Sequence, residues 1–190
     1  MFGNIFEKQP KPRETPRDFK RVALMVIAPQ NFRDEECFET KDELEKAGIK
    51  VEIASLTKGE KRGTHGGLIN ADMPIGSVNV EDYDAVVFIG GAGAQIYFQN
   101  PIALDIARQA YNTGKITAAI CVAPVILANS GVLNGKKATI WEGPDTMKVF
   151  RDKNVDYTGK SVEVDGKIVT ANGPKASREF GRKIAELLKR

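Results

Sequence analysis

The sequence of 190 residues contains few of the residues that build disulfide or metal sites. It has two cysteines, Cys37 and Cys121, which excludes a disulfide framework and leaves at most one bridge. Its single histidine, His65, excludes a multi-histidine metal site, and the two distant cysteines do not have a zinc-binding spacing. We therefore expect no metal ion.

Long hydrophobic runs are also missing. The longest nearly apolar stretch, residues 116–128, is interrupted by Pro124 and is shorter than the roughly 18 residues that a membrane helix needs. The N-terminal residues lack the basic region and apolar core of a secretory signal. We expect a soluble, cytoplasmic protein with free thiols and no membrane partner.

Charge is unevenly distributed along the chain. The formal net charge of +3 lies entirely within residues 1–21, where three prolines punctuate six basic and three acidic residues. The remaining residues are electrically balanced, which argues against a nucleic-acid partner. Residues 1–20 are interpreted as a basic, proline-containing arm, and residues 21–190 as one domain, long enough to bury a full core.

The hydrophobic pattern alternates between strands and helices. It predicts strands at 22–28, 51–55, 68–71, 85–89, 115–120 and 137–141, a turn at 58–63, helices at 34–47, 101–112, 122–129, 145–151 and from 174 onward, and a hairpin through Asp165-Gly166. Such alternation predicts an α/β fold with a doubly wound, mostly parallel sheet and helices on both faces. Sites in these folds lie beyond the carboxyl ends of the strands. Three loops qualify, those after Ala28, Ile89 and Ile120.

The loop after Ile120 has the spacing of a nucleophile elbow. Small residues, Ala119 and Ala123, lie two positions before and after Cys121, which lets strand and helix approach each other. Backbone N–H groups at the start of the following helix are expected to lower the thiol pKa and to hold an oxyanion. The alternative is that Cys121 is a small buried hydrophobe.

The other two loops are less specific. Residues 90–94 have the sequence Gly-Gly-Ala-Gly-Ala, which is a weak match to a dinucleotide-binding motif because Ile96 occupies the position of the third glycine. The segment either approaches Cys121 and supplies a backbone N–H to an oxyanion, or it forms a simple turn. Acids at 34–36 complement the dipole of the predicted helix, or one of them faces the thiol and keeps a proton. His65 is a surface residue unless a Cys–His pair recruits it.

Four segments add a family resemblance: 47–51 (AGIKV), 86–91 (VVFIGG), 118–121 (AAIC) and 170–174 (TANGP). On these segments the chain, from about Lys20 to Leu188, resembles the ThiJ/PfpI superfamily, which includes the parkinsonism-associated deglycase and PfpI-type intracellular peptidases. The resemblance implies a flavodoxin-like fold, a homodimer or larger homo-oligomer, and a reaction without a cofactor.

The resemblance also implies roles for individual residues. Cys121 becomes the elbow nucleophile, Glu36 the acid that contacts its sulfur, and Gly91 and Val122 the backbone N–H donors of the oxyanion hole. Gly90 and His65 are accessory candidates.

Three positions depart from the family pattern. Val122 stands where peptidase-type members have histidine, and Gln95 where they have a glutamate that acts in the partner subunit. Trp141 stands at the position of a histidine in the deglycase branch. Both companions of a Cys-His-Glu triad are therefore missing.

We interpret the sequence as that of a cysteine-dependent enzyme acting on small electrophilic carbonyls, in the manner of a glyoxalase or deglycase, with Glu36 as proton shuttle. An alternative is a redox-sensing or stress-protective protein that works through oxidation of Cys121, with a minor option of a disulfide to Cys37. A third is an intracellular cysteine peptidase or amidase.

Overall fold

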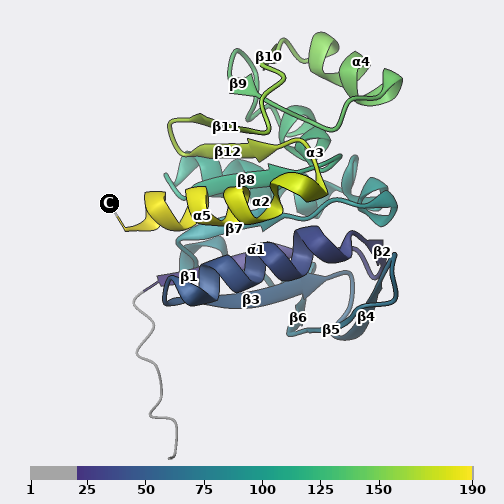
Figure 1. Ribbon diagram of the computed structural model, residues 1–190, viewed down its shortest axis with the longest axis vertical. Coiled ribbons are helices and arrows are strands. Elements are labelled where there is room, and N and C mark those ends of the chain that lie inside the picture. The colour runs from purple at the N-terminus through teal and green to yellow at the C-terminus, as the bar shows by residue number, and fades with distance from the viewer. Residues whose placement is uncertain (1–20, 190) are drawn as a thin grey trace, which may run out of the picture.

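The computed structural model describes residues 21–189, and a seven-stranded sheet forms their centre (Figure 1). The strand order is β11-β12-β8-β7-β1-β3-β6, and every neighbouring pair is parallel except β11 and β12. The strands are β1 (Arg21–Val26), β3 (Ile49–Ser55), β6 (Met73–Pro74), β7 (Ala85–Phe88), β8 (Ile116–Ile120), β11 (Val162–Asp165) and β12 (Ile168–Ala171). The five longer parallel strands have the flavodoxin-like order, so the predicted fold class is confirmed.

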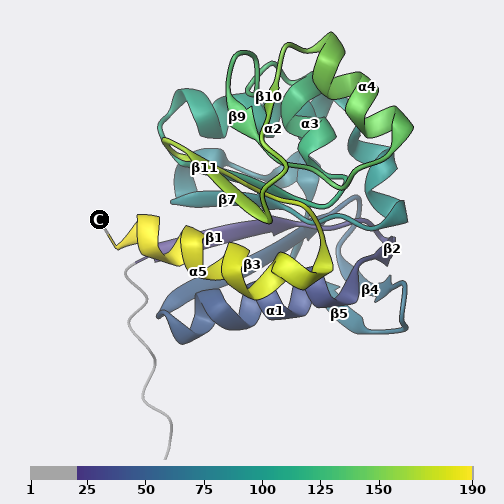
Figure 2. The same cartoon turned by 45° about the horizontal axis from the view of Figure 1, so that its top comes forward.

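Helices cover both faces of this sheet (Figure 2). α1 (Asp34–Lys46) and α5 (Ser177–Leu188) lie side by side on one face. α2 (Pro101–Asn112) and α3 (Pro124–Asn129) lie on the other, with α4 (Pro144–Asp152) beyond α3. Within residues 21–189, no helix combines the length and the apolar character that crossing a bilayer requires.

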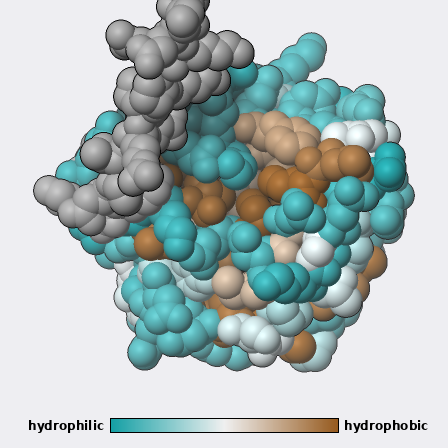
Figure 3. All heavy atoms as spheres, turned by 90° about the horizontal axis from the view of Figure 1, so that it is seen from below, coloured by the Kyte–Doolittle hydropathy of each residue, from teal (hydrophilic) through white to brown (hydrophobic). Residues whose placement is uncertain are grey.

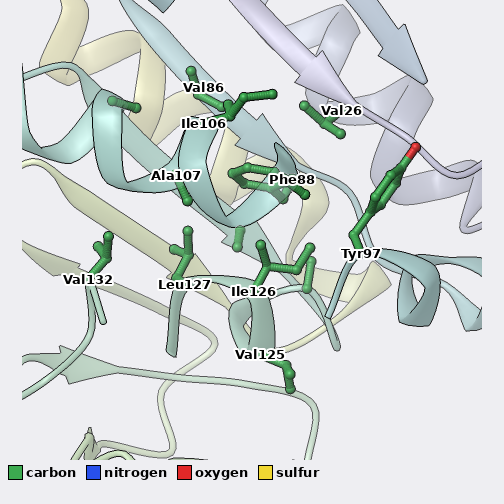
Figure 4. Close-up of a cluster of buried hydrophobic side chains, with 14 of the residues drawn as sticks. Val26, Val86, Phe88, Tyr97, Ile106, Ala107, Val125, Ile126, Leu127 and Val132 are labelled. Carbon is green, nitrogen blue, oxygen red and sulfur yellow. The ribbon is translucent and has the colours of Figure 1, made fainter. Parts of the chain in front are cut away.

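Alternate residues of the buried strands point into two separate cores. In β1, Leu24 and Val26 face the α2–α3 side, whereas Ala23 and Met25 face the α1–α5 side. Figure 4 shows the first core, where Phe88 lies among side chains from α2 and α3. Because both faces are covered, these strands are continuous apolar runs.

The structure differs from the sequence expectation at residues 58–63. Instead of a turn, Gly59–Gly63 form β4, which pairs with β5 (Leu68–Ala71) and with β2 (Gln30–Phe32). The sequence did not predict this strand because charged residues dominate it. Lys61 is nevertheless buried, and its ammonium donates hydrogen bonds to Thr57 Oγ1 and to the carbonyls of Lys58 and Glu60.

Smaller differences occur at element ends. α3 begins at Pro124 rather than 122, and β9 (Lys137–Ala138), paired with β10 (Asp156–Tyr157), ends before Trp141. Short 3₁₀ helices occupy 75–77, 80–82, 92–97 and 174–176. The hairpin through Asp165-Gly166 is present. The arm expected at 1–20 lies outside the described residues.

Candidate active site

Cys121 occupies a strained turn between β8 and α3. Its φ of 63° lies in the left-handed region that residues with a side chain rarely adopt. The Cys121 N–H donates to the Ala171 carbonyl at 2.9 Å, and its carbonyl accepts from the Trp141 N–H at 2.9 Å. These bonds to β12 and to the segment after β9 hold the strained residue in place, as a nucleophile elbow requires.

Glu36 points inward from the first turn of α1 and is fully buried. The Gly90 N–H donates to its Oε2 at 3.0 Å, whereas Oε1 accepts no regular hydrogen bond from the described residues. Burial raises the pKa of Glu36 to about 7, against the opposing effects of the Cys121 thiol, the Gly90 N–H and the charge of Arg33. The carboxyl is thus poised to exchange a proton near neutral pH.

Gly90 lies between these two side chains. A Cβ atom at this position would be 2.6 Å from Glu36 Oε2 and 2.7 Å from Cys121 Cβ. The neighbouring Gly91, with a φ of 95°, approaches the backbone of residues 31–33, in the segment after Ala28, and the Arg33 N–H donates to the Gly90 carbonyl at 3.1 Å. The three loops singled out by the sequence therefore meet at one point.

The thiol pKa differs from the sequence expectation. Burial raises the pKa of Cys121 to about 12, the charge of Glu36 adds to the rise, and the N–H groups of Gly91 and Val122 oppose it. The helix start does not produce a resting thiolate, because desolvation and a neighbouring carboxylate outweigh the backbone dipoles. The thiol needs a base, and Glu36 is the carboxylate beside it.

The other two acids of the first turn serve the structure. Asp34 accepts hydrogen bonds from the N–H groups of His65 at 2.8 Å and Gly67 at 2.7 Å, and so ties α1 to the β4–β5 hairpin. Glu35 forms a two-bond pair with Arg33. The His65 side chain is exposed, 4.0 Å from Glu35, and does not line the cavity at Cys121.

A cavity of about 270 Å³ opens onto Cys121. Its walls are Arg33, Glu36, Thr64, Gly91, Ala92, Cys121, Val122, Trp141 and Pro174. Sequence reasoning did not assign Arg33, Thr64 or Pro174 to the site. Only the position of Arg33, directly before α1 in the segment after Ala28, could have suggested it. Among residues 21–189, no group of three His, Cys, Asp or Glu side chains could hold a metal ion.

Comparisons with known proteins show the family to which the chain belongs. The sequence profile described as the DJ-1/PfpI family matches residues 20–187. Protein MJ0967 of Methanocaldococcus jannaschii is 39% identical over 94% of this chain and 86% of its own. Deglycase PfpI of Pyrococcus furiosus is 32% identical over 88% of this chain and 100% of its own.

A solved structure extends the similarity to three dimensions. The ThiJ/PfpI domain protein from Brachyspira murdochii superposes with a TM-score of 0.85 at 34% identity, covering 88% of this chain and 96% of that protein. The residues that the family profile matches, 20–187, include the whole sheet and all three loops around Cys121. The chain therefore belongs to the DJ-1/PfpI family.

Proposed function

We propose that the protein is an enzyme that uses Cys121 as a nucleophile on small electrophilic carbonyls such as methylglyoxal or its adducts. The observation that supports this most is the fully buried Glu36 carboxyl, with a pKa near 7, facing a thiol at a strained turn. The substrate class rests on relatives, one of which is named deglycase PfpI. The reaction proposed below needs no cofactor.

Glu36 starts the reaction by accepting the thiol proton while the Cys121 sulfur attacks the aldehyde carbon. The N–H groups of Gly91 and Val122, already directed at the sulfur, stabilise the oxygen charge of the hemithioacetal. Glu36 gives the thiol proton to this oxygen and is a carboxylate again. It then takes the proton from the former aldehyde carbon and delivers it to the neighbouring ketone carbon, while the hydroxyl proton passes to the ketone oxygen. The product is a thioester of a 2-hydroxy acid, in which the aldehyde carbon is oxidised and the ketone reduced, so no external oxidant is needed. Water breaks its C–S bond, which releases the hydroxy acid and restores the Cys121 thiol.

A redox role is a second candidate, supported by the same pair of side chains. Cys121 is 9% exposed and Glu36, when protonated, can donate a hydrogen bond to a sulfinate. The peptidase alternative has less support, because the only histidine lies outside the cavity walls and Val122 and Gln95 replace the triad partners.

Incubation with methylglyoxal, followed by assay of lactate, tests the proposal. Cys121→Ala should abolish turnover, and Glu36→Gln should lower it about 10²–10⁴-fold because the base is lost. Glu39→Gln, one turn later on α1 and directed at Arg178, is the matched control and should keep wild-type turnover. Turnover that survives Cys121→Ala contradicts the mechanism. No turnover by the wild type favours the redox role.

We also propose that the protein is a homo-oligomer in a reducing compartment such as the cytoplasm. Figure 3 shows a group of hydrophobic residues above the centre of the face seen from below, with further hydrophobic residues scattered toward its edges, and such groups mark interaction sites. Both cysteines are free thiols. Light scattering that gives a monomer mass would contradict the oligomer.

A further inference from the structure

A second cavity, of about 490 Å³, adjoins the one at Cys121. The two share the walls formed by Arg33, Trp141 and Pro174. Cavities of this size typically hold ligands larger than methylglyoxal, which would fill only part of the space at Cys121. A molecule bound with its carbonyl at the sulfur can therefore extend past Trp141 into the second cavity.

Cations predominate on the walls of this second cavity. Two cationic side chains, Arg33 and Lys175, line it, and they are far apart in the sequence. The one carboxylate among the walls is Glu142, which accepts a hydrogen bond from the Tyr157 hydroxyl. Nε and Nη2 of Arg33 donate hydrogen bonds to the Glu35 carboxylate at 2.8 and 3.1 Å, and Nη1 takes no part in this ion pair. This arrangement fixes the guanidinium plane, which prepares it for an oxyanion.

Trp141 supplies an apolar wall between the two cavities. Its side chain is 52% exposed, and its ring lies against Gly173, where an added Cβ would be 2.8 Å from Cε3. Glycine at 173 thus leaves space for the ring. An exposed indole in a cavity that Arg33 and Lys175 also line suits a molecule with a short carbon chain and an anionic end.

We infer that Arg33, Lys175 and Trp141 form a subsite for an anionic group, a carboxylate or a phosphate, on the carbonyl compound that reacts at Cys121. The inference deepens the proposed function and depends on it for the role of the subsite. Neutral methylglyoxal is then a poor mimic of the substrate. A longer 2-oxoaldehyde with an anionic end places its aldehyde at the sulfur and its charge beside Lys175.

The test compares 4,5-dioxopentanoate with its methyl ester, which differ in charge but share the reacting carbonyls. The wild type should prefer the acid in kcat/KM by at least about tenfold, the effect of one charge-assisted hydrogen bond. Lys175→Gln should reduce this preference about tenfold, and Lys175→Arg should restore it. Lys183→Gln, which alters a lysine on α5 paired with Glu186, should keep the wild-type preference.

Fluorescence gives a readout that does not need turnover, because Trp141 is the only tryptophan. Titration with succinate and with inorganic phosphate should change its emission saturably in the wild type and not in Lys175→Gln. The tighter of the two titrants tells whether the subsite favours carboxylate or phosphate.

The two measurements separate failure of the inference from failure of the proposed function. Equal kcat/KM for acid and ester, or a preference unchanged in Lys175→Gln, overturns the subsite while the cysteine mechanism stands. If the wild type converts neither compound, the proposed function fails, and the fluorescence titration alone decides on the anion site. Absence of a saturable change in that case overturns the site as well.

Discussion

The Glu36 carboxyl is buried beside the Cys121 thiol, and burial raises the pKa of Glu36 to about 7. Only the carboxylate can accept the thiol proton, so kcat/KM for methylglyoxal should rise with pH, about tenfold per unit, and level off above about pH 7. The Cys121 pKa, raised to about 12, contributes no inflection in this range. In Glu36→Gln the inflection should vanish. A flat wild-type profile would contradict Glu36 as the base.

The two cysteines should differ in their reaction with hydrogen peroxide. Cys121 is 9% exposed and lines a cavity, whereas Cys37 is a completely buried residue of α1, and burial raises the Cys37 pKa to about 12. Peroxide can reach Cys121 through the cavity, and Glu36 can accept its thiol proton, so we expect Cys121 to oxidise faster than Cys37. Peptide mass spectrometry across a peroxide titration should find oxygen on Cys121 first, and more slowly in Glu36→Gln. Equal or earlier oxidation of Cys37 would show that the elbow does not activate its cysteine.

Sequence reasoning named Cys121 and Glu36 and offered that an acid facing the thiol keeps a proton, but it expected a lowered thiol pKa, whereas the Cys121 pKa is raised. The small residues around Cys121 reveal the elbow, because the turn restricts side-chain size locally. The pKa of the thiol depends instead on how deeply the folded chain buries it and on which carboxylate faces it. Neither quantity can be obtained from spacing along the chain.

At the level of elements, the sequence predicts the strands of the central sheet better than the short strands and loops around the site. Apolar runs identify β1, β7 and β8, whose carboxyl ends define the site. β4 was missed because its buried lysine is satisfied by local carbonyls and hydroxyl rather than by an apolar environment. The wall shared by Arg33 and Trp141 depends on the approach of segments more than 100 residues apart.

The meeting of the three loops depends on glycine at 90. Gly90→Ala would place a Cβ 2.6 Å from Glu36 Oε2 and 2.7 Å from the Ile120 carbonyl, and backbone cannot move aside cheaply. We expect a loss of about 1–3 kcal/mol in unfolding free energy from overpacking, with a loss of activity larger than the fraction unfolded explains.

Gly76→Ala is the matched control for this substitution. Its added Cβ would meet no atom closer than 3.9 Å, so stability should change by less than about 1 kcal/mol and turnover should stay at the wild-type level. Urea unfolding and lactate assay on both variants give the comparison. A Gly90→Ala variant with wild-type turnover would show that the loops need not approach so closely.

For the molecule as a whole, the buried Glu36 carboxyl makes the free energy of unfolding depend on pH. The Glu36 pKa is raised from 4.5 in the unfolded chain to about 7 in the folded protein, so the folded state binds more protons between these values. The stabilising contribution of the protonated carboxyl is therefore complete below about pH 4.5 and is lost as pH rises through about 7. Its size is about 3 kcal/mol, from the shift of the pKa.

Glu36→Gln isolates this contribution, because its amide is neutral at every pH. The unfolding free energy of the variant minus that of the wild type should increase by up to about 3 kcal/mol from pH 4.5 to above 7, since only the wild type must bury a charge. Urea unfolding of both proteins across this range measures the difference, and ionisations elsewhere cancel in it. Parallel stability curves would mean that Glu36 titrates normally, and the inflection in kcat/KM would then lie near pH 4.5 instead of near 7. Glu36 would in that case be a much weaker base toward the Cys121 thiol than the proposed chemistry needs.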